Sequence, residues 1–538
     1  MKKRFQTIVS LLCLAALLVG MLAGCSSSSS STPAPADSTA PAATPGNSDD
    51  EEPASDGPLF AEPVTFSMLI PSHASWPFQE DWYVLDVLKE YTNVDFNITY
   101  VDTSGFTEKV NLTMSSGELP DMISLLDGSV VQQYAPQGAF VNVLEHLDEM
   151  PHFKAWYEAN QQYALNYLSA DGALYTFPQQ GVEETNRRGW LYRADIFEEL
   201  DLQVPTNKDE FYDVLVALKA AYPNSYPLAF RSFASTMNQI NMLAPAWGTS
   251  FMDTEDNRFF GYNYDTNEWT FGPTSAEFKE MLEFYHKLYE EGLLLPNFLT
   301  IDTKGWQDVI ANSDSFITLD YLSRIDFFNN SMRESDPDFT IAYMAPPAFN
   351  ETIGNQFAYS TKALENIAVS SQTKHLDEVL AYIDWLYSDE AEEVVSWGRP
   401  GELYTETSGE RAWKEFSTAA EMKQATGLQT FGFYLRYNFD GELSTFTAEC
   451  RSAAEQARGY DLLQQPILAY TEEEQDVVNT IGLNIQTFVH EQVSKFLLGE
   501  RSFDEWDSYV AEVEAMGLED LKAVHESSYA RVLALKNN

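Results

Sequence analysis

Basic residues are scarce in this sequence. Lys and Arg number 32 against 82 Asp and Glu, which gives a formal net charge of −50. A surface of this sign repels phosphate backbones and anionic lipid headgroups. The composition therefore argues against nucleic-acid binding and against adsorption of the folded body to a membrane.

Cysteine is also rare. The chain has three, Cys13, Cys25 and Cys450, and Cys13 lies in an apolar N-terminal run. This number excludes a disulfide framework. We expect Cys450 to be a buried packing residue rather than a nucleophile, because that is the commoner use of a single thiol.

Recognisable catalytic motifs are missing as well. The seven His residues are isolated, and the sequence contains no His-Glu-x-x-His, Gly-x-Ser-x-Gly, P-loop or dinucleotide-binding pattern. We therefore expect neither a cofactor nor a catalytic metal. Glycoside hydrolysis needs only two opposed carboxylates, so the sequence leaves that reaction open.

The N-terminus has the layout of a signal peptide. Basic residues at 2–4 precede an apolar run at 8–22, as in exported proteins. The run is at the short limit for a membrane span and is followed at once by Ser and Pro, which weakens the alternative of a transmembrane anchor. Leu22-Ala23-Gly24-Cys25 resembles the bacterial lipobox, so we expect residues 1–24 to be removed and Cys25 to be the lipid anchor.

The segment that follows the lipobox is low in complexity. Residues 25–58 are rich in Ser, Pro and Ala and lack the apolar groups that would offset the entropy of ordering. They are predicted to form a disordered tether. No later stretch approaches the roughly 18 uninterrupted apolar residues of a membrane span, so the rest of the chain is predicted to fold outside the bilayer.

The first part of the folded region alternates strands and helices. Apolar, β-branched segments at 64–70, 94–101 and 122–126 read as strands, with helical patterns near 82–91 and 106–116 between them. This rhythm predicts an α/β fold with a mainly parallel sheet. In such sheets, ligands bind at the carboxyl ends of the strands.

The middle and the end of the chain are predicted to be mainly helical. Apolar residues repeat every three or four positions after Thr206, which suits a helix N-cap, and through 279–294, where Gly292 suits a C-cap. The same pattern runs through 376–395. Ser502 and Glu505 are predicted to open a further helix with a capping box.

The order of several short segments resembles the family 1 extracellular solute-binding proteins of bacterial ABC importers, in particular their long lipoprotein branch. The resemblance spans nearly all of 62–532. Its pieces are Lys109-Val-Asn-Leu-Thr-Met-Ser-Ser-Gly-Glu-Leu-Pro-Asp-Met-Ile123, Asp171-Gly-Ala-Leu-Tyr-Thr-Phe-Pro178, the segment 191–206, the segment 281–293, the segment 382–404, Phe496-Leu-Leu-Gly-Glu500 with Phe503-Asp-Glu-Trp506, and Tyr529-Ala-Arg-Val532.

The resemblance implies an α/β, two-lobed periplasmic-binding-protein-like fold of type II, with a hinge and an interlobe cleft. By analogy, 59–178 and 313–347 are assigned to lobe 1, and 179–312 and 348–538 to lobe 2. The implied function is capture of a carbohydrate, such as an oligosaccharide, by a monomeric lipoprotein on the extracytoplasmic face of the membrane. An ABC permease would receive the ligand. The alternatives are a surface-retained glycan hydrolase and a binding protein for another nutrient, such as a peptide.

A sugar site needs flat aromatic platforms beside hydrogen-bonding or charged groups, because a sugar ring has an apolar C–H face and a rim of hydroxyls. Aromatic residues make up 14 % of the chain, which leaves some for such a site. Candidates in predicted loops or at strand ends are Trp76, Arg188, Trp190, Trp247, Asp320, Tyr321, Trp397 and Arg399. Each has the alternative of ordinary core packing, the commoner use of large aromatics, and Trp385, Trp413 and Trp506 fall in helical patterns that predict the core.

One segment departs from the family pattern. Relatives often carry an Asp-x-Asn-x-Asn-Gly type of loop that resembles a calcium site, near the position of 221–227 here. This chain has Ala221-Tyr-Pro-Asn-Ser-Tyr-Pro227 instead. Calcium needs several oxygen ligands at fixed spacing, so we predict no calcium at this loop.

Overall fold

The computed structural model describes residues 57–125, 129–181, 187–231, 237–252, 254, 257–357 and 363–536. They belong to one compact unit, Ser55–Asn538. The predicted signal peptide, Cys25 and most of the predicted tether lie outside the described residues. No helix in the described ranges is long and apolar enough to cross a membrane.

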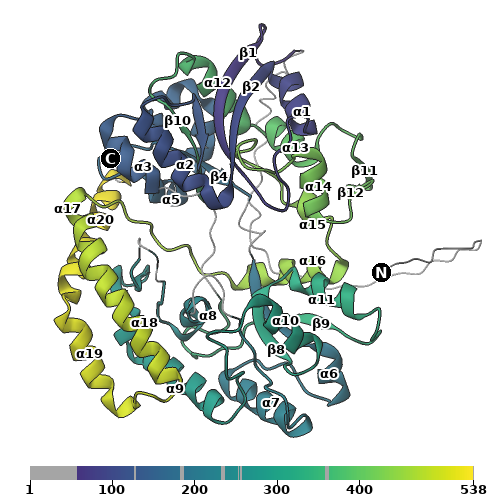
Figure 1. The fold of residues 1–538 in the computed structure, drawn as a ribbon, viewed down its shortest axis with the longest axis vertical. Helices are drawn as coiled ribbons and strands as arrows, with labels where there is room; N and C mark the ends of the chain where they lie inside the picture. The colour runs from purple at the N-terminus through teal and green to yellow at the C-terminus, as the bar shows by residue number, and fades with distance from the viewer. Residues whose placement is uncertain are drawn as a thin grey trace, which may run out of the picture. The chain divides into compact units, whose positions relative to one another are not determined.

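The predicted strand and helix rhythm at the start of the folded region is confirmed. Strands β1 (Val64–Ser72), β2 (Val94–Asp102) and β3 (Met122–Ser124) are parallel, and helices α1 (Tyr83–Thr92) and α2 (Thr103–Ser116) connect them. In Figure 1, α1 lies beside the paired strands β1 and β2. This arrangement directs the loops that follow β1 and β2 to the same edge of the sheet.

Two later strands complete this sheet. Strands β4 (Phe177–Gln180) and β10 (Ala363–Val369) give a five-stranded order β2-β1-β3-β10-β4, in which β10 is antiparallel to both neighbours. Successive residues of β1 enter different apolar clusters: Met68 and Ile70 belong to one and Leu69 to another. Because side chains alternate along a strand, the sheet is buried on both faces.

A second, three-stranded sheet has the order β8-β5-β9. Strand β5 (Arg188–Arg193) pairs antiparallel with both β8 (Ile317–Tyr321) and β9 (Ile341–Met344). It too is covered on both faces, since Trp190 and Leu191 enter different apolar clusters. We call the body around the five-stranded sheet lobe 1 and the body around this sheet lobe 2.

The strand pairing corrects the expected lobe boundaries. The segment 313–347, assigned to lobe 1 by analogy, carries β8 and β9, which hydrogen-bond to β5 in lobe 2. The segment 348–538, assigned to lobe 2, carries β10 of lobe 1. It also carries α12 (Leu376–Leu386) and α13 (Asp389–Trp397), whose apolar residues pack into the lobe 1 core.

The chain therefore changes lobe between β4 and β5, again between β9 and β10, and again within 438–449. Residues 435–437 run parallel to the end of β4: Gln180 N donates to Leu435 O, and Tyr437 N donates to Gln180 O. After the short helix α15 (Asp440–Leu443), helix α16 (Ala448–Ala457) packs through Cys450 into an apolar cluster of lobe 2. The first and the third of these connections therefore leave lobe 1 next to each other.

Most of the remaining helices belong to lobe 2. They are α6 (Ala194–Glu199), α7 (Lys208–Ala221), α8 (Asn238–Leu243), α9 (Ala276–Glu290), α10 (Thr303–Ala311), α11 (Arg324–Met332), α18 (Leu483–Leu497) and α19 (Trp506–Ala515). Helix α18 packs along α9 (Figure 1). The last helix, α20 (Leu518–Lys536), enters the lobe 2 core through Leu521 and the lobe 1 core through Val532.

Several predicted helix ends are shifted. The N-cap of α7 is Asn207 rather than Thr206, because the Asn207 side chain accepts from Glu210 N. The pattern at 376–395 is two helices, since Ser388 caps the start of α13. Helix α9 ends at Glu290, close to the expected Gly292.

A buried histidine makes the stability of lobe 2 depend on pH. Burial lowers the pKa of His525 to about 4, although the carbonyls of Leu521 and Asn257 lie 3.0 and 3.1 Å from its ring nitrogens and oppose the shift. The unfolded chain, with a His pKa near 6.5, then binds this proton first as the pH falls. The free energy of unfolding is expected to drop by about 3 kcal/mol between pH 6.5 and pH 4 through this group.

Urea unfolding at a series of pH values tests this expectation. His525→Gln removes the titrating group, so the variant should show a flatter dependence than the parent between pH 6.5 and pH 4. Above pH 7 the two slopes should agree. Equal slopes in the acid range would show that another group carries the effect.

Candidate functional site

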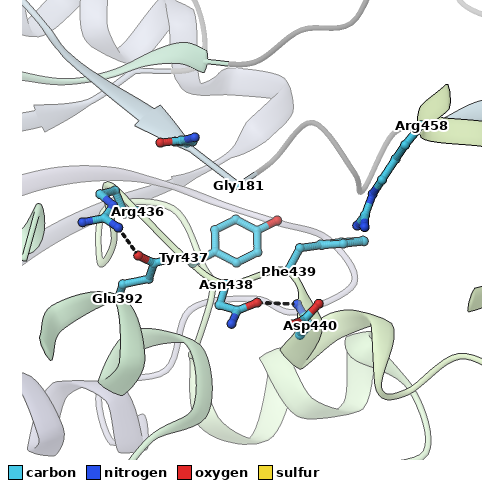
Figure 2. A pocket seen from close by; sticks show the side chains of 9 residues that line it. Gly181, Glu392, Arg436, Tyr437, Asn438, Phe439, Asp440 and Arg458 are labelled. Atoms are coloured by element: carbon cyan, nitrogen blue, oxygen red, sulfur yellow. Dashed lines mark hydrogen bonds and ion pairs between the residues drawn. The ribbon is translucent and has the colours of Figure 1, made fainter. Parts of the chain in front are cut away.

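A pocket of about 270 Å³ lies where the chain leaves lobe 1 (Figure 2). Its walls come from the end of β4, from α13 and from the segment that runs beside β4 towards α16. The lining residues are Gln180, Gly181, Glu392, Arg436, Tyr437, Asn438, Phe439, Asp440 and Arg458. The pocket therefore adjoins the first and third changes of lobe.

The backbone at the pocket rim requires glycine. Gly181 has φ +110°, a conformation that side chains with a Cβ rarely adopt. A Cβ at this position would lie 2.4 Å from the carbonyl oxygen of Tyr437. The close approach brings the two crossing segments together and places the Tyr437 ring against Gly181 (Figure 2).

The polar groups of the pocket are partly fixed by one another. Arg436 pairs with Glu392 across the pocket wall (Figure 2). Its Nη1 also lies 3.1 Å from Asp389 Oδ1. Burial raises the pKa of Glu392, with Arg436 opposing the shift. Asn438 Oδ1 accepts from Asp440 N at 2.8 Å. Amides, carboxylates and a guanidinium beside the rings of Tyr437 and Phe439 are groups that suit sugar hydroxyls and C–H faces.

A second group of polar and aromatic side chains lies at the carboxyl end of β8 in lobe 2. Asp320 is 3 % exposed and accepts from Arg231 through both oxygens, at 2.5 and 3.1 Å. Arg324 Nε donates to the same carboxylate at 3.1 Å. Arg188, on the neighbouring strand, stacks 4.4 Å over the ring of Tyr321 and donates to its hydroxyl at 2.7 Å.

Lobe 1 contributes aromatic rings at the ends of β1 and β2. Trp76 is half-buried and stacks on His73 with ring centroids 3.8 Å apart. The Lys423 ammonium lies 5.1 Å from the centroid of the Trp76 ring. The pKa of His73 is lowered, mainly by burial and to a smaller extent by the charge of Lys423. Tyr100, which is 49 % exposed, lies beside Phe78 in the same region.

The predicted site residues divide into those at these positions and those in the core. Arg188, Asp320 and Tyr321 come together at the end of β8, and Trp76 lies in the loop after β1. Asp320 differs from the others in that it is not available to a ligand, because both of its oxygens already accept hydrogen bonds from arginines. Its role is to position them.

The expectation of ligand contact is corrected for three tryptophans. Trp190, Trp247 and Trp397 are 1–2 % exposed. Trp190 points from β5 into the lobe 2 core and meets Phe349, which also stacks on Trp247. Trp397 stacks on Trp413. Trp190 and Trp247 belong to the apolar core of lobe 2, and Trp397 is a buried residue at the end of α13, so none presents a face to a ligand.

Arg399 is also placed away from the other candidates. Its Nε donates to Glu90 at 2.6 Å, and its guanidinium lies 5.0 Å from the Tyr83 ring. It therefore joins the end of α13 to α1 on the surface of lobe 1. Burial alone would lower the pKa of Arg399, but the hydrogen bonds to Glu90 and Glu402 outweigh this effect. The pKa is therefore raised, and the side chain stays charged.

Sequence reasoning missed other residues at these positions. Tyr437 lies in a segment without a strong secondary-structure pattern, and Tyr100 was counted as part of a strand. Arg324 lies four residues after Asp320, and Phe327 lies six residues after Tyr321. Both residues are on helix α11. The sequence did contain a signal for these two residues, because a charged and an aromatic residue closely follow a buried strand.

The described residues contain no group of three or more His, Cys, Asp or Glu that could hold a metal ion. At the loop 221–227, the ammonium of Lys219 donates to Ser225 O at 2.6 Å and lies 4.9 Å from the Tyr226 ring. The ammonium of Lys219 therefore binds a loop carbonyl that a metal cation could otherwise coordinate. Cys450 is buried, which raises the pKa of its thiol to about 12 and makes it a poor nucleophile.

The loop geometry predicts that calcium does not bind at 221–227 and therefore does not stabilise the protein through this loop. Treating the protein with EDTA and then adding millimolar calcium should leave Tm unchanged at both steps, because Lys219 already occupies the loop carbonyl of Ser225. Differential scanning calorimetry measures this directly. A rise in Tm with calcium would reveal a cation site and contradict the expectation.

Comparison with protein families gives one match. Residues 83–397, more than half of the chain, match the model of the bacterial extracellular solute-binding proteins. Curated proteins that are similar in sequence include the following two. Lipoprotein LipO of Bacillus subtilis is 24 % identical over 64 % of this chain and 69 % of its own length. The fructooligosaccharide ABC transporter substrate-binding protein FusA of Streptococcus pneumoniae is 22 % identical over 84 % of this chain and 88 % of its own.

Solved structures share the fold. A solute-binding protein from Bifidobacterium longum infantis, described as HMO-binding and associated with an ABC transporter, superposes with a TM-score of 0.70. The superposition covers 88 % of this chain and 99 % of that one, at 17 % sequence identity. The expected two-lobed α/β fold is therefore confirmed.

Proposed function

Because the chain belongs to the bacterial extracellular solute-binding proteins, we propose that it captures an oligosaccharide outside the cytoplasm and passes it to the permease of an ABC importer. FusA and the Bifidobacterium protein are both described as substrate- or solute-binding proteins of ABC transporters. FusA is named for a fructooligosaccharide, and the Bifidobacterium protein is described as HMO-binding. The chain holds the glycan and leaves its bonds unchanged.

One structural observation carries the proposal. Aromatic rings stand beside hydrogen-bonding groups at the sheet ends of both lobes and at the pocket between the crossing segments. Trp76 and Tyr100 belong to lobe 1, Tyr321 and Arg188 to lobe 2, and Tyr437 to the pocket. A sugar needs both kinds of group, a flat apolar surface and directed polar partners.

Calorimetry with a panel of neutral and acidic oligosaccharides tests the proposal. We expect saturable binding of at least one glycan with one molecule per chain, and chromatography after a long incubation should recover that glycan intact. Shortened products would indicate a hydrolase. Binding of peptides but of no glycan would indicate another nutrient. Either result would overturn the proposal.

We further propose that the protein is held at the membrane by lipid on Cys25, which lies outside the described residues. Leu22-Ala23-Gly24-Cys25 has the lipobox pattern, and the relative LipO is named as a lipoprotein. Cys25→Ala is expected to abolish incorporation of labelled palmitate and to move the protein out of the membrane fraction. Ser26→Ala is the matched control and should keep both. Retained label in Cys25→Ala would place the lipid elsewhere.

A further inference from the structure

A single lysine contacts both the Trp76 ring and a buried carboxylate. The Lys423 ammonium lies 5.1 Å from the centroid of the Trp76 ring, and it donates to Glu442 Oε2 at 2.9 Å. The side chains of Lys423 and Glu442 are only 8 and 10 % exposed. Because a cation is attracted more strongly to a carboxylate and to an aromatic face where water is excluded, both contacts restrict where this lysine can lie.

The Trp76 ring is also held by its neighbour in the loop after β1. His73 stacks on the ring with an interplanar angle of 17° and so covers one of its faces. Because burial and, to a smaller extent, Lys423 lower the pKa of His73, its imidazole is uncharged at neutral pH and does not repel the lysine. The Trp76 side chain nevertheless stays partly exposed, so part of the ring is open to a ligand.

Lys423 lies on a helix that is bound to the same loop. Near the end of helix α14 (Ala419–Thr426), Gln424 O accepts from Gln79 Nε2 at 2.8 Å and from Trp82 Nε1 at 2.9 Å. These two hydrogen bonds involve the residue that directly follows the lysine. They therefore fix the backbone of the lysine relative to the loop after β1.

Glu442 belongs to the third connection between the lobes. It lies in helix α15, within the segment 438–449 in which the chain passes from lobe 1 to lobe 2. The next residue, Leu443, and Phe446 pack against apolar clusters of both lobes. The carboxylate that binds the lysine is thus part of the junction between the lobes.

We propose that Lys423 is a positioning residue for glycan binding, which holds the Trp76 ring against a sugar and is itself held by Glu442 at the junction between the lobes. This inference rests on the proposed function, with Trp76 as one of its sugar contacts. A buried ammonium that loses its carboxylate is uncompensated and turns towards water. That movement takes it away from the Trp76 ring, which then binds a sugar less well.

A double-mutant cycle in titration calorimetry tests whether Glu442 acts through the ring. The probe is whichever of 1-kestose, maltotetraose, lacto-N-tetraose and tetragalacturonic acid the parent binds most tightly. Trp76→Ala is expected to weaken binding by roughly tenfold or more. Glu442→Gln is expected to weaken it by roughly 3- to 30-fold, the range of one desolvated cation–π contact.

The combined variant separates the possible results. If Glu442 acts through the ring, adding Glu442→Gln to Trp76→Ala should change the affinity by less than about twofold. Equal effects of Glu442→Gln with and without the Trp76 ring would overturn the inference and leave glycan capture intact, and so would an unchanged affinity in Trp76→Ala. If the parent binds none of the four glycans, the proposed function fails, and the inference fails with it.

Two further variants keep the test independent of folding. The double variant Lys423→Met/Glu442→Leu replaces the buried pair by apolar groups of similar size, a change that often preserves stability. It should unfold near the Tm of the parent and still bind the probe roughly 3- to 30-fold more weakly. Lys423→Arg keeps the charge and should bind more tightly than Glu442→Gln. Parent affinity in the folded double variant would show that the lysine does not position the ring.

Asp195→Asn is the matched control for lost stability. Asp195 pairs with Arg193, whose side chain is 2 % exposed, at the opposite end of β5 from Arg188. This variant also removes the carboxylate of a largely buried ion pair, so it should lower Tm but leave the affinity for the probe unchanged. A similar loss of affinity in Asp195→Asn and Glu442→Gln would mean that reduced stability explains the weaker binding, and the inference would be wrong.

Discussion

Asp320→Asn is expected to lower the free energy of unfolding by about 3–5 kcal/mol, the usual cost of removing one partner of a buried ion pair. Asp320 and Arg231 are each 3 % exposed, and Arg324 shares the same carboxylate. The amide keeps the size of the side chain but removes the negative charge that Arg231 binds through Nε and Nη2, in a place that water does not reach. The loss therefore reflects the removed charge more than a change of packing.

Urea unfolding of the parent and the variant measures this loss. Asp308→Asn on α10 is the matched control, because Asp308 also pairs with a basic residue, Lys304, but both are exposed. Exposed pairs contribute little, so this variant should unfold at nearly the same urea concentration as the parent. An equally small change in Asp320→Asn would show that the buried pair does not hold β8 and the segment of Arg231 together.

Gly181→Ala is expected to destabilise the junction between the lobes. A residue with a Cβ at φ +110° costs about 1–3 kcal/mol in backbone strain. The added Cβ would also lie 2.4 Å from Tyr437 O, a backbone atom that cannot move aside as a flexible side chain does. Because the two crossing segments meet here, the variant should lose ligand affinity as well as stability.

Gly117→Ala separates strain from collision. Gly117 also has a positive φ, +73°, but a Cβ there meets nothing within 4 Å. We expect a modest fall in Tm for Gly117→Ala with unchanged glycan affinity in calorimetry. Gly181→Ala should show a larger fall in Tm and weaker binding. Similar behaviour of the two variants would mean that the approach of Gly181 to Tyr437 does not matter for ligand binding or for the junction between the lobes.

The strand rhythm and the family were predictable from the sequence because both depend on local pattern. The alternation of apolar segments fixed β1, α1 and β2 within a few residues. The lobe boundaries were not predictable in the same way. Whether 313–347 joins one sheet or the other depends on the pairing of β8 and β9 with β5, and strands of either sheet have the same apolar pattern.

The candidate site was only partly predictable. Trp190 lies two residues beyond Arg188 on β5, yet it points into an apolar cluster of lobe 2, while Arg188 stacks on Tyr321. Both faces of this sheet are buried, so alternation could not tell which strand end carries a ligand. Trp190→Ala is expected to destabilise the lobe 2 core, as large-to-small core substitutions do, rather than to remove a sugar contact.

Small-angle X-ray scattering with and without a saturating glycan tests the central claim, that one ligand is held by groups of both lobes. Closure of two lobes around a shared ligand makes the protein more compact. We therefore predict a smaller radius of gyration for the fully loaded protein than for the free one. An unchanged radius at full occupancy would contradict the claim, because the glycan would then be bound by one lobe alone.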